Sequence, residues 1–139
     1  LDMFNGEILS YGISKTPSAA SVLSAQKKAI EITSDCPYRR TFHSDRGWAY
    51  QMSTYSYALK ENKIFQSMSR KGNCYDNAVM ECFFKYLKKE ETNRRNYSSL
   101  AELQLSLFKY INGFYNSLRP HSHNNGLSPN QAEAIYFSF

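Results

Sequence analysis

Two acidic residues, Asp45 and Glu81, carry the clearest chemical signal in the sequence. Thirty-five residues, 46–80, separate them, and Asp45 stands in the segment His-Ser-Asp-Arg-Gly. Carboxylates are hard oxygen ligands suited to Mg²⁺, and two such ions about 3.5–4 Å apart stabilise both the attacking and the leaving oxygen of a phosphodiester displacement. The pair therefore predicts metal-dependent chemistry on a nucleic acid. Such a site usually contains a third acid, and the sequence offers no evident candidate.

A simpler reading of the two acids stays open at this point. Asp45 could begin a turn with Gly47, and Glu81 could form an ordinary ion pair with Lys85 one helical turn later. Neither role requires a metal or a substrate.

The helix expected around Glu81 favours the chemical reading. Asn77, Glu81, Lys85 and Lys88 follow helical spacing along one face. At a rise of roughly 1.5 Å per residue, Glu81 and Lys88 lie about 10 Å apart. A metal at Glu81 and phosphates at the lysines could then belong to one DNA strand, whereas a solvated charged face remains the alternative.

The elements that must position these residues can be read from apolar periodicity and turn signals. Their order is strand, strand, helix, strand, helix, strand, helix, helix, followed by a short terminal helix, which predicts an α/β fold with a mixed sheet flanked by helices in one domain, residues 1–139. The expected segments are strands Leu1–Phe4 and Glu7–Ile13 around an Asn5-Gly6 turn, helix Ala19–Ile32, strand Tyr38–Ser44, helix Thr54–Glu61, strand Lys63–Ser67, a helix ending at Glu90, a helix from Ser99 to Tyr115, and a helix opened by Ser128.

Capping signals and apolar stripes define the helix ends and buried faces. Ser53 is expected to cap the second helix, Asp76 or Asn77 the third, and two Ser-x-x-Glu/Gln capping boxes begin at Ser99 and Ser128. The expected buried positions are Met80, Phe83, Phe84 and Leu87 in the third helix, and Leu103, Leu107, Tyr110 and Phe114 or Ile111 in the fourth.

Charge and composition restrict the class of partner and compartment. Seventeen Lys and Arg against twelve Asp and Glu give a net charge of +5, which favours a polyanionic partner without naming it. Three cysteines without a C-x-x-C pair argue against a secreted disulfide framework. The same cysteine usage indicates a reducing cytoplasm. With no apolar run of about 18 residues, we expect no membrane partner.

Several loop residues could assist the acids. Loops that would border the site carry Arg46, Arg70, Lys71 and Asn73 as candidates for DNA contact. Trp48 and Tyr50 could stack on an unpaired base or pack against the sheet. The three histidines lack ligand spacing for zinc and are expected to be loop or surface residues.

Taken together, these segments resemble the catalytic core of insertion-sequence transposases of the OrfB type, which are similar to retroviral integrase. The resemblance rests on four segments that span essentially the whole chain. These are His43–Gly47 with Tyr50; Ser69 with Gly72 and Asn73; Asp76–Glu90; and Tyr115–His121 with Gly126–Pro129.

The resemblance implies a ribonuclease-H-like fold and a D,D(35)E active site. Asp45 and Glu81 would be the catalytic metal ligands for Mg²⁺ or Mn²⁺, and Lys88, with Lys85, would position terminal phosphates. Arg119 and His121 would contact DNA near the site. The partners would be double-stranded transposon ends and target DNA, and the protein would form a homo-oligomer. Its location would be the bacterial cytoplasm, in association with the nucleoid.

One departure concerns the amino end. In the register of the resemblance, the first catalytic aspartate and the first strand fall before residue 1, whereas Asp2 matches a structural position. We therefore expect an amino-terminally truncated core that is inactive alone, with two metal ions bound only in the full-length core. The alternative, from a different class, is a noncatalytic DNA-binding or assembly module derived from a transposase. A structure-selective nuclease of the same fold is a third possibility.

Overall fold

The computed structural model describes residues 1–138, which divide into two compact units. One unit is Ser10–Cys82, and the other combines Leu1–Leu9 with the chain from Phe83 onward. Among the described residues, no helix is both long and apolar enough to cross a bilayer.

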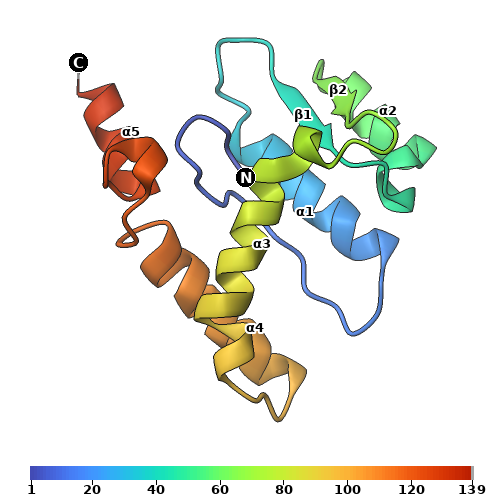
Figure 1. The fold of residues 1–139 in the computed structure, drawn as a ribbon. Helices are drawn as coiled ribbons and strands as arrows, with labels where there is room; N and C mark the ends of the chain where they lie inside the picture. The colour runs from blue at the N-terminus through green and yellow to red at the C-terminus, as the bar shows by residue number, and fades with distance from the viewer. Residues whose placement is uncertain (139) are drawn as a thin grey trace. The chain divides into compact units, whose positions relative to one another are not determined.

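The Ser10–Cys82 unit pairs helices with a small parallel sheet (Figure 1). Strand β1 pairs with β2 in the register Thr41↔Phe65 to Ser44↔Met68. Parallel neighbours need a crossover connection, and helix α2 lies in the connection between these two strands. The elements are α1 (Ala19–Ile32), β1 (Thr41–Ser44), a 3₁₀ turn (Trp48–Gln51), α2 (Ser53–Glu61), β2 (Phe65–Met68) and a 3₁₀ turn (Cys74–Asn77).

A compact apolar cluster holds this unit together. Its buried members are Ile30 from α1, Tyr55 and Leu59 from α2, and Ile64 before β2, and Phe42 of β1 packs against them. The buried side-chain amide of Gln26 donates to the carbonyl of Tyr55 at 2.8 Å, which joins α1 to α2. The cluster fixes the two strands, and with them the position where β1 ends.

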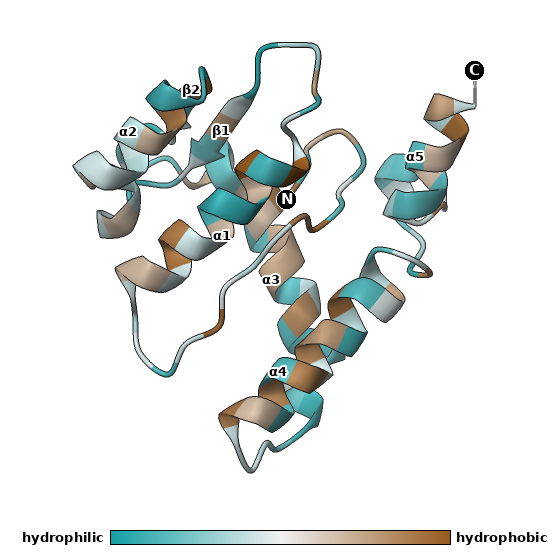
Figure 2. Cartoon of the chain, turned by 180° about the vertical axis from the view of Figure 1, so that it is seen from behind, coloured by the Kyte–Doolittle hydropathy of each residue, from teal (hydrophilic) through white to brown (hydrophobic). Residues whose placement is uncertain are grey.

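The second unit is mostly helical. Its elements are α3 (Ala78–Glu90), which begins in the other unit, a 3₁₀ turn (Thr92–Arg94), α4 (Leu100–Phe108), a π-helical segment (Lys109–Tyr115), a 3₁₀ turn (Ser122–Asn124) and α5 (Pro129–Phe137). Ser128 closes the expected capping box with Gln131. At Ser99 only half of the expected box forms: Ser99 Oγ accepts from Glu102 N at 3.1 Å, but the Glu102 carboxylate accepts from Ser98 N at 2.8 Å. Figure 2 shows apolar bands along α4, where Leu105 and Phe108 are exposed.

The expected strands at the amino end are a wrong prediction. Residues 1–13 form no strand in the described chain; instead, Asp2 N donates to Glu7 O and Gly6 N to Asp2 O, both at 2.8 Å, and Gly6 has φ +80°. The turn at Asn5-Gly6 is therefore real, but it closes a loop. Ile8 pairs with a side chain, because Asn116 Oδ1 accepts from Ile8 N at 2.9 Å and Asn116 Nδ2 donates to Ile8 O at 3.0 Å.

Details of the other elements also differ from the sequence expectations. Ser53 is the first residue of α2 and does not cap it, since Met52 holds the N-cap position without a side-chain bond. Both strands form with altered bounds, β1 three residues shorter at its start and β2 shifted toward Met68. In α3, Phe83 is buried as expected, whereas Phe84 is 47% exposed.

The π-helical segment changes which residues of the fourth helix are buried. Asn116 N donates to Ile111 O at 2.9 Å and Arg119 N to Phe114 O at 2.7 Å, both five residues back. A wider turn moves later residues around the axis relative to an α-helix. Tyr115 therefore takes the buried position expected for Phe114, which is 39% exposed, while Tyr110 and Ile111 are buried.

Candidate active site

Asp45 lies directly after β1, at the end of the strand that the apolar cluster fixes. Its side chain is exposed, and Oδ1 accepts a hydrogen bond from Gly47 N at 2.7 Å. A Cβ at Gly47 would stand 2.9 Å from that oxygen, so glycine permits the turn. Burial raises the pKa of Tyr50, and the Asp45 carboxylate raises it further, which places these two side chains near one another. The turn expected at Asp45 is thus present and leaves one carboxylate oxygen free of this hydrogen bond.

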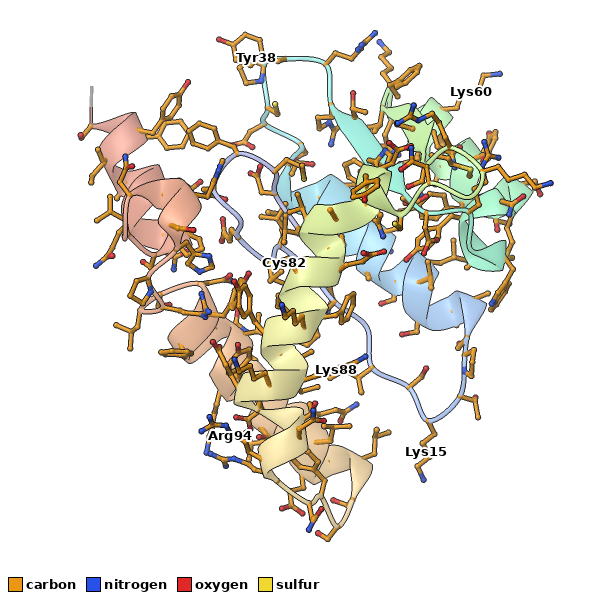
Figure 3. The ribbon with its side chains drawn as sticks, viewed as in Figure 1. Lys15, Tyr38, Lys60, Cys82, Lys88 and Arg94 are labelled. Atoms are coloured by element: carbon orange, nitrogen blue, oxygen red, sulfur yellow. The ribbon has the colours of Figure 1, made fainter. Side chains whose placement is uncertain are left out.

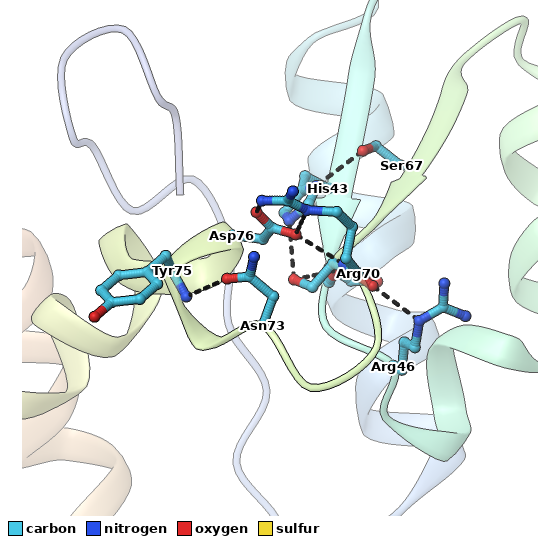
Figure 4. A network of polar contacts seen from close by, with 9 residues as sticks. His43, Arg46, Ser67, Arg70, Asn73, Tyr75 and Asp76 are labelled. Carbon is cyan, nitrogen blue, oxygen red and sulfur yellow. Dashed lines mark hydrogen bonds and ion pairs between the residues drawn. The ribbon is translucent and has the colours of Figure 1, made fainter.

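The loop after β2 is closed by an ion pair between Arg70 and Asp76 (Figure 4). The guanidinium donates from Nη2 to Oδ1 at 2.9 Å and from Nε to Oδ2 at 3.0 Å, and Arg70 N donates to Oδ2 at 2.8 Å. These bonds lower the pKa of Asp76 to about 2. Asp76, expected as a helix cap, therefore holds the loop, while Asn73 Oδ1 caps the 3₁₀ turn through Tyr75 N at 3.0 Å.

Further contacts join this loop to the end of β1. His43 places Nδ1 2.9 Å from Ser67 Oγ and Nε2 3.2 Å from Ser69 Oγ. Arg46 Nε donates to Ser69 O at 2.9 Å, and Ser69 N donates to Ser44 O at 2.9 Å. The residues on either side of Asp45 are thus bonded to the segment that leads through Arg70 and Asp76 to α3.

Glu81 stands in the first turn of α3, five residues after Asp76, and its side chain is exposed. Asn77, at the end of the preceding 3₁₀ turn, is half-buried. Lys85 and Lys88 follow on the same helix and are both exposed, and Figure 3 labels Lys88 along α3. Lys71 is also exposed. The sequence-predicted acids and cations therefore occupy accessible positions.

The donor set matches the chemistry of a magnesium ion only in part. Asp45 and Glu81 offer hard oxygen ligands on accessible side chains. Within residues 1–138, however, no three His, Cys, Asp or Glu side chains are grouped so that they could hold a metal ion. The described residues alone do not complete a metal site.

Arg119 and His121 both make contacts within their own unit, which combines Leu1–Leu9 with the chain from Phe83 onward. Arg119 Nη2 donates to Glu90 Oε1 at 2.8 Å, and the guanidinium lies 4.2 Å from the centre of the Tyr86 ring. His121 Nε2 lies 3.2 Å from Tyr115 O, and burial lowers the pKa of His121. A DNA phosphate would have to compete with Glu90 for Arg119.

Two ion pairs were not predicted from the sequence. Asp76 and Glu90 are the acids that hold Arg70 and Arg119, at separations of 6 and 29 residues. A separation of six across a loop containing Gly72 is a signal that could have suggested the first pair. The Arg119–Glu90 pair joins segments that are distant in the sequence, so no local pattern could have predicted it.

Family models match most of the chain. One model described as "Integrase core domain" matches residues 1–74, and a second with the same description matches residues 81–134. The two matches together cover both candidate acids and the lysines of α3.

Curated relatives match much of the chain. The putative transposase InsK for insertion sequence element IS150 of Escherichia coli K12 is 42% identical over 130 residues, covering 93% of this chain and 45% of that protein. A protein of Lactococcus lactis named ATP-dependent protease is 51% identical over 94 residues, which is 68% of this chain and 30% of that protein. The chain thus spans less than half the length of either relative.

Solved structures share the fold. The intasome of simian T-cell lymphotropic virus in complex with the PP2A regulatory subunit B56 gamma aligns with a TM-score of 0.62 at 18% identity, covering 86% of this chain and 41% of that chain. The catalytic core domain of BIV integrase aligns with a TM-score of 0.53 at 18% identity, covering 88% and 78%. These alignments confirm the ribonuclease-H-like α/β fold class.

Proposed function

Because the chain belongs to the integrase core domain family of insertion-sequence transposases, we propose that it is the catalytic-core part of an enzyme that cuts and joins DNA during transposition. Its substrates would be transposon ends and target DNA, and its reaction a polynucleotidyl transfer. The observation that carries the proposal is the set of bonds that ties the end of β1 beside Asp45 to the segment leading into α3 and Glu81.

Asp45 and Glu81 are proposed as the two carboxylates that this chain contributes to a Mg²⁺ or Mn²⁺ site. When bound, such ions neutralise developing charge on the oxygens of an in-line phosphodiester displacement. The described residues supply no third ligand grouped with them, so we expect no nicking by this chain alone and expect two ions only when a further acid is supplied. The hydrogen bond from Gly47 N to Asp45 Oδ1 at 2.7 Å restricts this carboxylate and supports the proposal.

The cations are proposed to hold the DNA backbone. Lys85 and Lys88 follow Glu81 by four and seven residues on α3, and both are exposed. Their ammonium groups would act as point charges on phosphates close to the cut. Within the Ser10–Cys82 unit, further DNA contacts are proposed for Arg46, Lys71, Asn73 and Asn77. Copies of the protein would assemble on the two ends.

A chimaera tests the catalytic proposal. This chain would replace the matching segment of the IS150 relative, and nicking and joining of a duplex carrying an insertion-sequence end would be measured with Mg²⁺, with Mn²⁺ and with EDTA. We expect metal-dependent nicking that Asp45→Asn and Glu81→Gln each reduce to background. Glu61→Gln, at an exposed acid at the end of α2, is the matched control and should retain activity.

Other results of this experiment would exclude the two residues or indicate a different function. Nicking that survives both substitutions would show that Asp45 and Glu81 are not catalytic. Cutting without joining would indicate a structure-selective nuclease. DNA binding by the chimaera without nicking under any metal condition would support the second candidate, a noncatalytic DNA-binding or assembly module. The lack of a three-ligand cluster in residues 1–138 favours this candidate.

A further inference from the structure

Tyr75 is the most exposed large apolar side chain in the described part of the chain, at 85%. It lies in the 3₁₀ turn Cys74–Asn77 that leads into α3. Exposed single apolar residues are common on protein surfaces and need no explanation by themselves. Tyr75 differs because its backbone is held on both sides while its ring remains in solvent.

The contacts around Tyr75 fix its backbone. On its amino side, Asn73 Oδ1 accepts from Tyr75 N at 3.0 Å. On its carboxyl side, Asp76 is held through three hydrogen bonds from Arg70, two from the guanidinium and one from the backbone amide. Figure 4 shows the Tyr75 ring directed away from the Arg70–Asp76 pair. Because the backbone of the turn is already fixed, binding of a flat partner would have to order only the side-chain rotamers of the ring.

The charges near the ring indicate what that partner is. The loop carries exposed Lys71, and the exposed Arg46 is bonded to the same loop through Ser69 O, while the Arg70 guanidinium is paired with Asp76. Cations that can meet phosphates beside an accessible aromatic ring are the combination with which proteins bind single-stranded nucleic acid, since every base has a face on which an aromatic ring can stack. In an intact duplex, base faces are covered by their neighbours, so a protein ring reaches them at frayed or single-stranded ends.

We infer that Tyr75 is a DNA-positioning residue whose ring stacks on an unpaired base at the end of the DNA held beside Asp45 and Glu81. This inference rests on the proposed function and extends it, since it makes the state of the DNA end a determinant of binding. The Arg70–Asp76 pair supports the ring indirectly by fixing the backbone of the turn. The phenol hydroxyl takes no part in stacking, so Phe can replace Tyr at this position.

Fluorescence of 2-aminopurine tests the stacking directly. The 139-residue chain would be titrated with two otherwise identical labelled duplexes, one carrying 2-aminopurine in a three-nucleotide single-stranded overhang and one carrying it in a blunt end. Anisotropy from a distant dye would report affinity, and 2-aminopurine intensity would report stacking. We expect tighter binding and quenching with the overhang.

Substitutions at Tyr75 test whether its ring, rather than the rest of the loop, binds the overhang. Tyr75→Ala should weaken binding to the overhang at least about fivefold and abolish quenching, with blunt-duplex affinity unchanged, because stacking of one base contributes about 1–3 kcal/mol. Tyr75→Phe should retain both signals. Tyr38→Ala is the matched control, because Tyr38 is 78% exposed but precedes β1, at the other end of that strand from Asp45.

The outcomes that overturn the inference differ from those that overturn the proposed function. Salt-dependent binding of both duplexes with equal affinity and no loss in Tyr75→Ala would remove the stacking role while DNA binding stands. An equal loss on both duplexes would also overturn it, because the ring would then contact paired DNA. Absence of binding to either duplex would overturn the inference and the proposed DNA interface together.

Discussion

Arg119 and Glu90 form a two-pronged ion pair in which Nη2 meets Oε1 at 2.8 Å and Nε meets Oε2 at 3.0 Å. The Arg119 side chain is 16% exposed and that of Glu90 is 27% exposed, and Tyr110 OH also donates to Glu90. The pair joins the end of α3 to the segment after the π-helical turn. Because both side chains are partly buried, we expect this pair to stabilise the fold more than an exposed ion pair does.

Arg119→Ala should lower the free energy of unfolding by about 1.5–3 kcal/mol, because it removes charge-assisted hydrogen bonds from a partly buried carboxylate. Urea unfolding monitored by circular dichroism measures the change. Arg94→Ala is the matched control, since the exposed Arg94 donates to the backbone carbonyl of Lys89 at 3.0 Å rather than to a carboxylate, and its loss should cost less than about 1 kcal/mol. Equal losses in the two variants would contradict the structural role of Arg119.

The Arg70–Asp76 pair should survive to low pH. Its hydrogen bonds lower the pKa of Asp76 from 3.8 to about 2 in the folded state. A lowered pKa stabilises the fold above the unfolded-state value, and this contribution is lost as the pH falls from about 4 through about 2. Carboxyl-detected NMR should show Asp76 titrating near 2, and Arg70→Ala should move the pKa back toward its ordinary value. An unchanged pKa in that variant would remove Arg70 as the cause.

Lys88→Ala should change the salt dependence of DNA binding. If Lys88 contacts one phosphate, its removal makes the slope of log affinity against log salt shallower by about 0.9. Lys60→Ala, on the exposed surface of α2, is the matched loss of one positive charge and should leave the slope nearly unchanged. The same slope for the wild type and Lys88→Ala would exclude Lys88 from the interface.

Asn116→Ala should destabilise the unit that contains Ile8. The buried amide satisfies both backbone groups of Ile8, at 2.9 and 3.0 Å, and its loss leaves a buried donor and acceptor unpaired at a cost of about 2 kcal/mol or more. Asn112→Ala removes a 3.4 Å bond at an exposed position and should have little effect on urea unfolding. Hydrogen exchange should also accelerate at the Ile8 amide in Asn116→Ala and not in Asn112→Ala.

The elements that the sequence predicted correctly are those determined by residues close to one another in the chain. The Ala19–Ile32 helix forms with the expected bounds, and Ser99 and Ser128 cap their helices because the bonded groups lie within three residues. Asp45 after β1 and Glu81 in α3 occupy the expected elements. Their roles as metal ligands stay a prediction.

The errors arise where a distant partner decides the structure. The backbone groups of Ile8 bond the side chain of Asn116, 108 residues later. A short apolar run after a turn does not reveal that a side chain, rather than a neighbouring strand, takes these bonds. Phe84 fits the apolar stripe of α3, yet the buried face is set by Phe83 against Tyr115, with ring centres 5.0 Å apart. The π-helical hydrogen bonds have no periodic signature in so short a segment.

That wide turn holds one residue more than an α-helical turn would. If Lys109–Tyr115 took ordinary α-helical spacing at its present length, every later side chain would rotate by about 100° around the axis. Arg119 would then lie away from the carboxylate that receives it. A return to α-helical spacing would therefore compensate for the loss of one residue from this segment, whereas the same loss within α4 would change the face on which every later side chain lies.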